Sequence, residues 1–184
     1  MTGGRAGVTL EAVTEASEGF RRTYEQHFEE VHRFLARLLG DSHAAEDATQ
    51  ETFVRLHRAF ATLDETRPLR PFVLAIARNV AIDALRARKK NVALVDGADR
   101  STGPAEAATA SERRAVVEEA LGALDPEHRS LLVLRHVHEL ELATIAEGAS
   151  CTVRTVRNRL RAAGEQLGRE LKRRGIVSSG EVRE

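Results

Sequence analysis

The chain has 184 residues, with 28 basic and 28 acidic side chains and therefore no net charge. Aromatic residues make up only 4% of it and tryptophan is absent, so an extensive β core is not expected. The longest uncharged apolar run covers residues 71–77, far short of the roughly 20 residues that a membrane-spanning helix needs. We therefore expect a cytoplasmic protein with no membrane insertion, and its single cysteine excludes an internal disulfide.

Basic residues are concentrated in two segments of this neutral chain. Residues 78–90 hold five basic side chains against one acid, and residues 151–174 hold eight against two. Because affinity for DNA comes largely from basic side chains that displace counterions at phosphates, both segments are candidate DNA contacts. The sequence contains no glycine-rich phosphate loop and no nucleophile beside a base, so we expect neither an enzyme nor a cofactor or metal site.

The first two predicted helices follow from apolar spacing and from one turn. Apolar residues spaced by three or four over residues 20–38 predict one buried helix face, which Gly40 ends. Asp41 or Ser42 is expected to cap the next helix. The first turn of that helix would then contain two acids that the helix dipole favours, Glu46 and Asp47.

A third helix is predicted from Pro71 onward, because proline suits a first turn. Its apolar residues are expected to point inward: Phe72, Val73, Ile76, Val80 and Leu85. Residues 20–90 therefore form a first helical domain after an N-terminal extension, 1–19. Residues 91–110 are rich in small and turn-forming residues and are predicted to be a flexible linker.

Residues 111–175 predict a second helical domain, followed by a short tail, 176–184. An apolar stripe that includes Val116 and Val117 stops at Asp125 and Pro126, and further helices are expected over 131–137, 140–147 and 152–171. The expected fold is therefore all-α, with two small helical domains joined by a flexible linker. The second domain is expected to be a four-helix, winged-helix-like helix-turn-helix DNA-binding domain.

The last two predicted helices have the pattern of a helix-turn-helix, with Thr152 as the expected N-cap of the second. Four polar residues of that helix are at positions i, i+3, i+4 and i+7 and so share one face, whereas Val153, Val156 and Leu160 line the opposite one. Arginine and asparagine can make bidentate contacts with guanine and adenine edges. The polar face consists of Arg154, Arg157, Asn158 and Arg161. A solvated basic face on an ordinary bundle helix is the alternative.

A second polar face is predicted on the third helix of the first domain. Its residues are spaced by 4, 3 and 4 positions and lie opposite the apolar side: Asn79, Asp83, Arg86 and Lys90. Asn79 and Arg86 could contact bases, and the basic residues at 88–90 could contact phosphates. The alternative is a helix end at which basic residues complete the dipole.

Four segments resemble extracytoplasmic-function sigma factors of the sigma-70 family, and they occur in the order that this family requires. Residues 45–53, AEDATQETF, resemble the polymerase-binding helix, and residues 76–83, IARNVAID, resemble the helix that engages the minus-ten element. Residues 124–129 and 131–137 resemble the start of the minus-thirty-five domain, and residues 145–146 and 155–160 match its helix-turn-helix. The resemblance thus covers most of both predicted domains.

The resemblance implies a role for three groups of residues. The clamp helices of the polymerase's largest subunit would face Asp47, Gln50, Glu51 and Arg55. The minus-ten element would be contacted by Arg78, Asn79, Asp83, Arg86, Arg88, Lys89 and Lys90. The minus-thirty-five element would be contacted by Thr152, Arg154, Thr155, Arg157, Asn158, Arg159 and Arg161.

The same resemblance implies partners and a mechanism. The partners would be core RNA polymerase, double-stranded promoter DNA, the melted non-template strand and an anti-sigma factor. The loop over residues 61–70 would help to hold a flipped base, so that binding energy rather than ATP melts the DNA. The chain departs from the family at Phe72, usually tryptophan, at Glu139, often a turn glycine, and at Thr144 and Arg154. The main alternative is a dimeric helix-turn-helix regulator that does not bind core polymerase through its first half.

Overall fold

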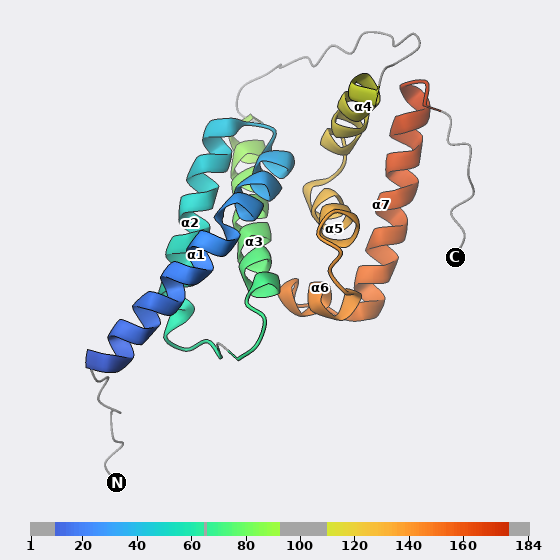
Figure 1. Cartoon of the computed structure of the whole chain (residues 1–184). Coiled ribbons are helices and arrows are strands. Elements are labelled where there is room, and N and C mark those ends of the chain that lie inside the picture. The colour runs from blue at the N-terminus through green and yellow to red at the C-terminus, as the bar shows by residue number, and fades with distance from the viewer. Residues whose placement is uncertain (1–9, 65, 93–109, 177–184) are drawn as a thin grey trace.

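The computed structural model describes residues 10–64, 66–92 and 110–176, and these ranges contain helices and no strand. The first domain comprises α1 (Leu10–Leu39), α2 (Ser42–Phe60) and α3 (Arg70–Val92). The second comprises α4 (Ala110–Gly122), α5 (Pro126–His136), α6 (Leu142–Gly148) and α7 (Val153–Arg173) (Figure 1). The predicted all-α fold of two helical domains is confirmed. None of the described helices is long and apolar enough to cross a membrane.

The structure extends the first predicted helix and leaves most of the predicted linker and tail outside the described residues. α1 begins at Leu10, inside the segment predicted as an N-terminal extension, and so lengthens the first helix by about ten residues. Most of the predicted linker, residues 93–109, and most of the predicted tail, residues 177–184, lie outside the described residues. The four predicted helices of the second domain correspond to α4 through α7.

The first domain packs its three helices around one apolar core. The fully buried side chains include Phe34, Leu35 and Leu38 from α1, Leu56 from α2 and Leu74 from α3. Those of α1 recur every one to three residues along the helix and so occupy one side of it. Burial of each large apolar side chain contributes roughly 1.5–3 kcal/mol, which fixes the three helices against one another.

The turn between α1 and α2 forms as predicted. Gly40 has φ +65°, a left-handed conformation that glycine adopts without steric cost, and it ends α1. Asp41 is the N-cap of α2 and accepts a hydrogen bond of 3.1 Å from a backbone N–H of the first turn. The prediction for Glu46 and Asp47 is wrong, because α2 already begins at Ser42 and these acids fall in its second turn.

The second domain is built on two capped helices. Asp125 caps α5 by accepting from the backbone N–H of Glu127 at 2.9 Å, and Pro126 occupies the first turn. Thr152 caps α7, and its Oγ1 accepts from the backbone N–H of Thr155 at 3.1 Å, as predicted. A separate small core lies between α5 and α7 and includes Leu132. The two caps thereby fix where α5 and α7 begin.

Three apolar residues expected to point inward are instead partly exposed. Phe72 and Val153 are each 37% exposed, and Val117 is 36% exposed. Phe72 and Val153 lie in the first turns of α3 and α7. Apolar spacing identifies the buried side of a helix, but it does not tell whether the helix end extends past the neighbours that would cover it.

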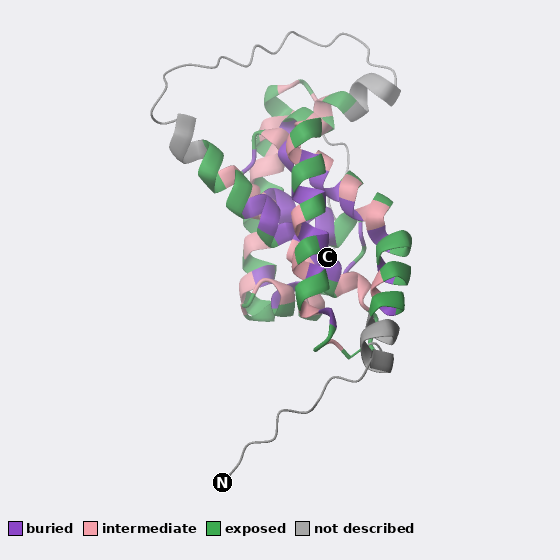
Figure 2. Ribbon diagram, turned by 90° about the vertical axis from the view of Figure 1, so that its left-hand side faces the viewer, coloured by how far each residue is buried: buried purple, intermediate pink, exposed green. Residues whose placement is uncertain are grey.

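The two domains pack against each other through a continuous apolar core. Leu131, Leu134 and Ile145 of the second domain belong to the same cluster of buried residues as the core of the first. The ring of Phe34 in α1 meets the ring of His138 edge-on, with centroids 5.2 Å apart. Figure 2 shows the buried residues gathered in the middle of the molecule. The described chain is therefore one closed body rather than two separated domains.

Candidate nucleic-acid and protein interfaces

The helix-turn-helix is formed by α6, a short turn and α7. Ser150 in the turn has φ +49°, and the backbone N–H of Cys151 donates to the carbonyl of Ala146 at 2.9 Å. The Cys151 side chain is half-buried and packs against the apolar core. The turn therefore holds α7 in a fixed orientation relative to α6.

The outer face of α7 presents the four polar residues that the sequence placed together. All of them are exposed: Arg154, Arg157, Asn158 and Arg161. Val156 and Ala163 on the opposite side are completely buried. Guanidinium and amide groups on one exposed helix face can reach into a major groove and bind base edges and phosphates.

Three further residues predicted for this surface make contacts within the protein. The Thr152 and Thr155 hydroxyls hydrogen-bond each other at 2.8 Å as part of the helix cap. Arg159 is half-buried and points back to α5, where its Nη1 lies 3.4 Å from Oε2 of Glu127. In this arrangement Arg159 serves the packing within the second domain.

The residues of α3 predicted to contact the minus-ten element differ in exposure, because the second domain covers some of them. Asn79 and Asp83 are exposed, but Arg78 is only 6% exposed and its Nε donates to Oγ of Ser130 in α5 at 3.1 Å. Burial lowers the pKa of Arg78, while the nearby Glu127 carboxylate raises it. Arg78 can therefore contact DNA only when α5 moves away.

Two further residues of this predicted minus-ten set, Arg86 and Arg88, form ion pairs. Nη2 of Arg86 lies 2.6 Å from Oε1 of Glu127, and Nη2 of Arg88 lies 3.9 Å from Oδ2 of Asp41. The side chains of Lys89 and Lys90 lie outside the described residues. Sequence reasoning missed Glu127 and Ser130, because partners that are 41 and 52 residues distant leave no local pattern.

The predicted polymerase-binding residues lie together on α2. Asp47 and Gln50 are exposed. Glu51 pairs with Arg55, with 2.7 Å between Oε1 and Nε, and this hydrogen bond raises the pKa of Arg55. Arg55 also lies 3.7 Å from Asp83 of α3, so a residue expected to face DNA belongs to this ion-pair group. The face offers carboxylate, amide and guanidinium groups to a protein partner.

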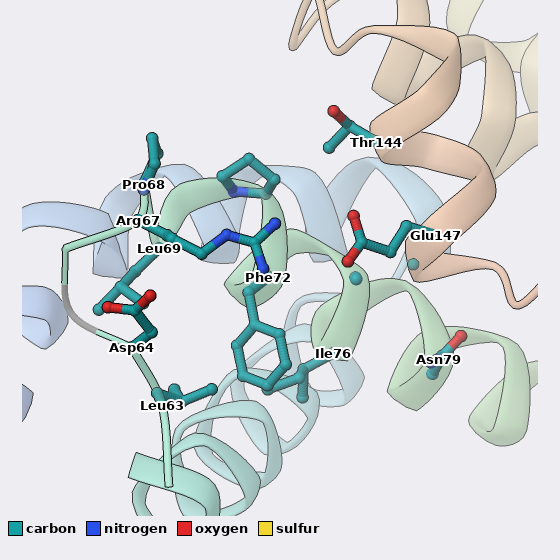
Figure 3. Close-up of a pocket in the computed structure, with 13 residues that line it drawn as sticks. Leu63, Asp64, Arg67, Pro68, Leu69, Phe72, Ile76, Asn79, Thr144 and Glu147 are labelled. Atoms are coloured by element: carbon teal, nitrogen blue, oxygen red, sulfur yellow. The ribbon is translucent and has the colours of Figure 1, made fainter. Parts of the chain in front are cut away.

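A pocket of about 490 Å³ separates the loop before α3 from α6. The first domain contributes Leu63, Asp64, Phe72, Ile76 and Asn79 to its lining. Figure 3 shows Thr144 and Glu147 of α6 on the opposite side of this pocket. The loop expected to hold a flipped base thus borders a cavity with apolar and hydrogen-bonding walls, and Phe72 is part of that cavity rather than of the core.

Comparison with protein families finds two matches that follow the two domains. The model described as Sigma-70 region 2 matches residues 23–91, and the model described as Sigma-70, region 4 matches residues 120–168. The first match contains α2 and all but the last residue of α3, and the second contains α6, the turn and most of α7.

Curated relatives match along most of the chain. It is 32% identical over 178 residues to the ECF RNA polymerase sigma factor SigL of Mycobacterium tuberculosis, covering 94% of this chain and 99% of that protein. It is 26% identical to SigW of Bacillus subtilis, an ECF RNA polymerase sigma factor, covering 84% and 90% respectively.

Two solved structures share the fold. The sigma factor RpoE of Bartonella quintana, solved with the anti-sigma factor NepR, gives a TM-score of 0.66 at 20% identity and covers 83% of this chain and 96% of that one. CnrH, solved with the cytosolic domain of CnrY, gives a TM-score of 0.62 at 21% identity and covers 88% and 95%.

Proposed function

The chain belongs to the extracytoplasmic-function sigma factors, which direct RNA polymerase to promoters, and from this premise we propose how its surfaces divide that work. The observation that carries the proposal is the distribution of polar faces over the two matched regions. α2 presents a mixed-charge face, α3 a polar face beside a pocket, and α7 an exposed basic face. A dimeric regulator would need neither of the first two faces.

The α2 face is the proposed contact with core RNA polymerase. It consists of Asp47, Gln50, Glu51 and Arg55, and the Glu51 to Arg55 ion pair holds two of these side chains in place. Binding to polymerase is expected to break the ion pair between Arg55 and Asp83, because this pair, at 3.7 Å, is partly exposed and therefore weak.

The α3 face and the neighbouring pocket are the proposed minus-ten contact. Asn79 borders the pocket and can hydrogen-bond a base, while Arg78, Arg86 and Arg88 supply positive charge along the strand. An aromatic ring such as Phe72 can stack on a base that leaves the duplex, which contributes about 1–3 kcal/mol per base. That is comparable to the few kcal/mol that unstacking costs, so binding can drive melting.

The α7 face is the proposed minus-thirty-five contact. Arg154, Arg157, Asn158 and Arg161 would read base edges in the major groove. Thr152 fixes the start of the helix and therefore the depth at which these side chains enter the groove.

The chain acts in this proposal by binding alone, without catalysis, in the cytoplasm, where RNA polymerase and the promoter are. An anti-sigma factor is a proposed partner, because RpoE, which shares this fold, was solved with one. Such a partner would inhibit by covering the α2 or α3 face.

Equilibrium binding to core RNA polymerase tests the central assignment. We expect the Asp47→Ala, Gln50→Ala, Glu51→Ala triple variant to lose affinity for core enzyme by tenfold or more, measured by fluorescence anisotropy. The matched control replaces two acids and an amide on the exposed part of α1, Glu18→Ala, Glu25→Ala and Gln26→Ala. Equal losses in the two triple variants would contradict the assignment.

A further inference from the structure

The pocket between the loop before α3 and α6 carries an unpaired charge on each of two walls. Arg67 of the loop and Glu147 of α6 line it, and both residues are exposed. Figure 3 shows the Arg67 guanidinium and the Glu147 carboxylate reaching toward one another above the ring of Phe72. Among the residues that the structure describes, neither side chain forms an ion pair or a hydrogen bond. The pocket therefore offers a ligand one cation and one anion beside an aromatic ring.

The other polar residues of this pocket are partly engaged within the first domain. Oδ1 of Asp64 accepts from the backbone N–H of Thr66 at 3.0 Å and from its hydroxyl at 2.6 Å. Oδ1 of Asn79 accepts from Nη1 of Arg78 at 3.2 Å, which leaves the Asn79 amide nitrogen as a hydrogen-bond donor. Glu147 is therefore the pocket carboxylate with both oxygens available, and Asn79 contributes a donor.

The remaining walls of the pocket are apolar and suit a flat ring. Leu63, Leu69 and Ile76 line it together with Phe72, whose ring is 37% exposed. An exposed aromatic ring stacks on the face of a nucleobase. The pocket volume of about 490 Å³ lies within the range of roughly 300–1,000 Å³ that small-molecule sites occupy. A molecule with one flat heterocycle therefore fits its size and its surface.

A second hollow, of about 400 Å³, shares the segment 67–69 with this pocket. Arg22 of α1 and Arg70 of α3 line it as well, and none of its described lining residues is acidic. Arg70 is already paired with Glu30, with 2.5 Å between Nη2 and Oε1, whereas Arg22 and Arg67 form no ion pair with a described residue. The hollow thus supplies positive charge for an anionic group attached to the ring.

The polar groups of the pocket match guanine better than adenine. Guanine carries two adjacent donors, N1–H and the N2 amino group, and an ionised carboxylate such as that of Glu147 accepts from both through its two oxygens. Adenine places an acceptor, its N1, where guanine has N1–H, so that atom would face the carboxylate. The guanine O6 and N7 atoms are acceptors, which suits the amide nitrogen of Asn79.

We propose that this chain binds free guanosine diphosphate, with guanine against Phe72 and Glu147 and the two phosphates at Arg67 and Arg22. Guanidinium groups bind phosphate oxygens through charge-assisted hydrogen bonds, and one arginine is available for each phosphate. Every group in this site comes from the chain itself, so binding requires neither DNA nor polymerase. Bound nucleotide would compete with the flipped base for the pocket, and this consequence alone rests on the proposed function.

Isothermal titration of the full chain with GDP and with ADP tests the base assignment. We expect GDP to bind about tenfold or more tightly than ADP, and Glu147→Gln to abolish this preference. Glu141→Gln is the matched control, because Glu141 is an exposed acid at the start of α6 that does not line the pocket. Absence of GDP binding, or equal affinities of the wild-type chain for GDP and ADP, would overturn the proposal.

Guanosine, which lacks phosphate, tests the second hollow in the same titration. We expect Arg22→Gln and Arg67→Gln each to weaken GDP binding by about tenfold and to leave guanosine binding unchanged. Arg21→Gln is the matched control, since Arg21 is the exposed neighbour of Arg22 on α1 and lines neither hollow. A loss in Arg21→Gln as large as that in Arg22→Gln would contradict the phosphate assignment.

A guanine-containing single-stranded oligonucleotide distinguishes a free nucleotide from a base within a strand. We expect GDP to displace this oligonucleotide from the wild-type chain and to fail to do so in Glu147→Gln. Oligonucleotide binding that depends on Glu147 while GDP does not bind would make a strand base the occupant and would overturn the proposal. Run-off transcription without added GDP reports on the sigma function separately, so failure of either proposal is distinguishable from failure of the other.

Discussion

Glu30 in α1 and His138 after α5 form a hydrogen bond across the domain boundary, with 2.8 Å between Oε1 and Nδ1. Burial raises the pKa of Glu30, but hydrogen bonds from Arg70 and His138 outweigh it and lower that pKa to about 2. Burial also lowers the pKa of His138, while its hydrogen bond to Glu30 raises it. The ionised Glu30 carboxylate is therefore a point at which pH acts on the stability of the closed chain.

We expect Glu30→Gln to reduce the free energy of unfolding at pH 7 by up to about 3 kcal/mol, from a pKa difference of about 2.5 at 1.36 kcal/mol per unit. Because the pKa of Glu30 is lowered by folding, its contribution is complete above pH 4.5 and is lost as the pH falls toward about 2. Urea unfolding at a series of pH values measures this difference.

Glu29→Gln is the control for that series, because Glu29 is exposed and lies next to Glu30 on α1. A wild-type to Glu30→Gln difference that stays constant from pH 7 to pH 3 would contradict the assignment. A loss of stability for Glu29→Gln as large as that for Glu30→Gln would also contradict the assignment.

Glu139 is expected to be a site of backbone strain. It has φ +55°, and this left-handed conformation costs a residue with a Cβ roughly 1–2 kcal/mol. Glycine avoids that cost, but it also gives the unfolded chain more conformational freedom, which offsets part of the gain in stability. We therefore expect Glu139→Gly to raise the free energy of unfolding by roughly 0.5–1 kcal/mol. Glu139→Ala keeps the Cβ and should give no such gain in the same denaturation experiment.

Thr152 is expected to matter through its cap rather than through direct DNA contact. Thr152→Ala removes the Oγ1 acceptor from the backbone N–H of Thr155 and should cost about 1 kcal/mol of stability. Thr152→Ser keeps the acceptor and should restore most of it. Thermal unfolding followed by circular dichroism distinguishes the two, and similar losses in both variants would show that the cap hydrogen bond is not the cause.

Arg157 is expected to contribute to base recognition by α7. Arg157→Ala should weaken binding to a duplex selected by the wild-type chain from a random pool by about 1–3 kcal/mol and relax preference at one position. Lys172→Ala, near the C-terminal end of the same helix, should weaken selected and unselected duplexes alike. A uniform loss for Arg157→Ala would instead make it a phosphate contact.

Local features of this fold were predictable from the sequence because their causes are local. The apolar spacing identified the helices, and Asp41 and Thr152 were identified as caps because short polar side chains satisfy the first N–H groups of a helix. By contrast, the family resemblance and not the local pattern marked Glu139 as standing where a turn glycine is common, and its positive φ is a conformation that glycine adopts without steric cost. The exposed polar face of α7 followed from spacing alone.

The contacts between domains could not be predicted in this way. Arg78 was expected to face DNA because it shares a helix with other basic residues, yet its surroundings are set by Ser130, 52 residues away. Likewise, the exposure of Phe72 depends on where α3 begins relative to its neighbours and on the pocket beside α6. Such relationships depend on how whole domains pack.

Run-off transcription tests the central claim most directly. Core RNA polymerase from the same organism is incubated with DNA from upstream of this protein's gene, with no sigma factor, with the wild-type chain, or with the Asp47→Ala, Gln50→Ala, Glu51→Ala variant. We predict a discrete transcript that requires the wild-type chain and fades with the variant. A wild-type chain that binds this DNA as a dimer and yields no core-dependent transcript would contradict the account.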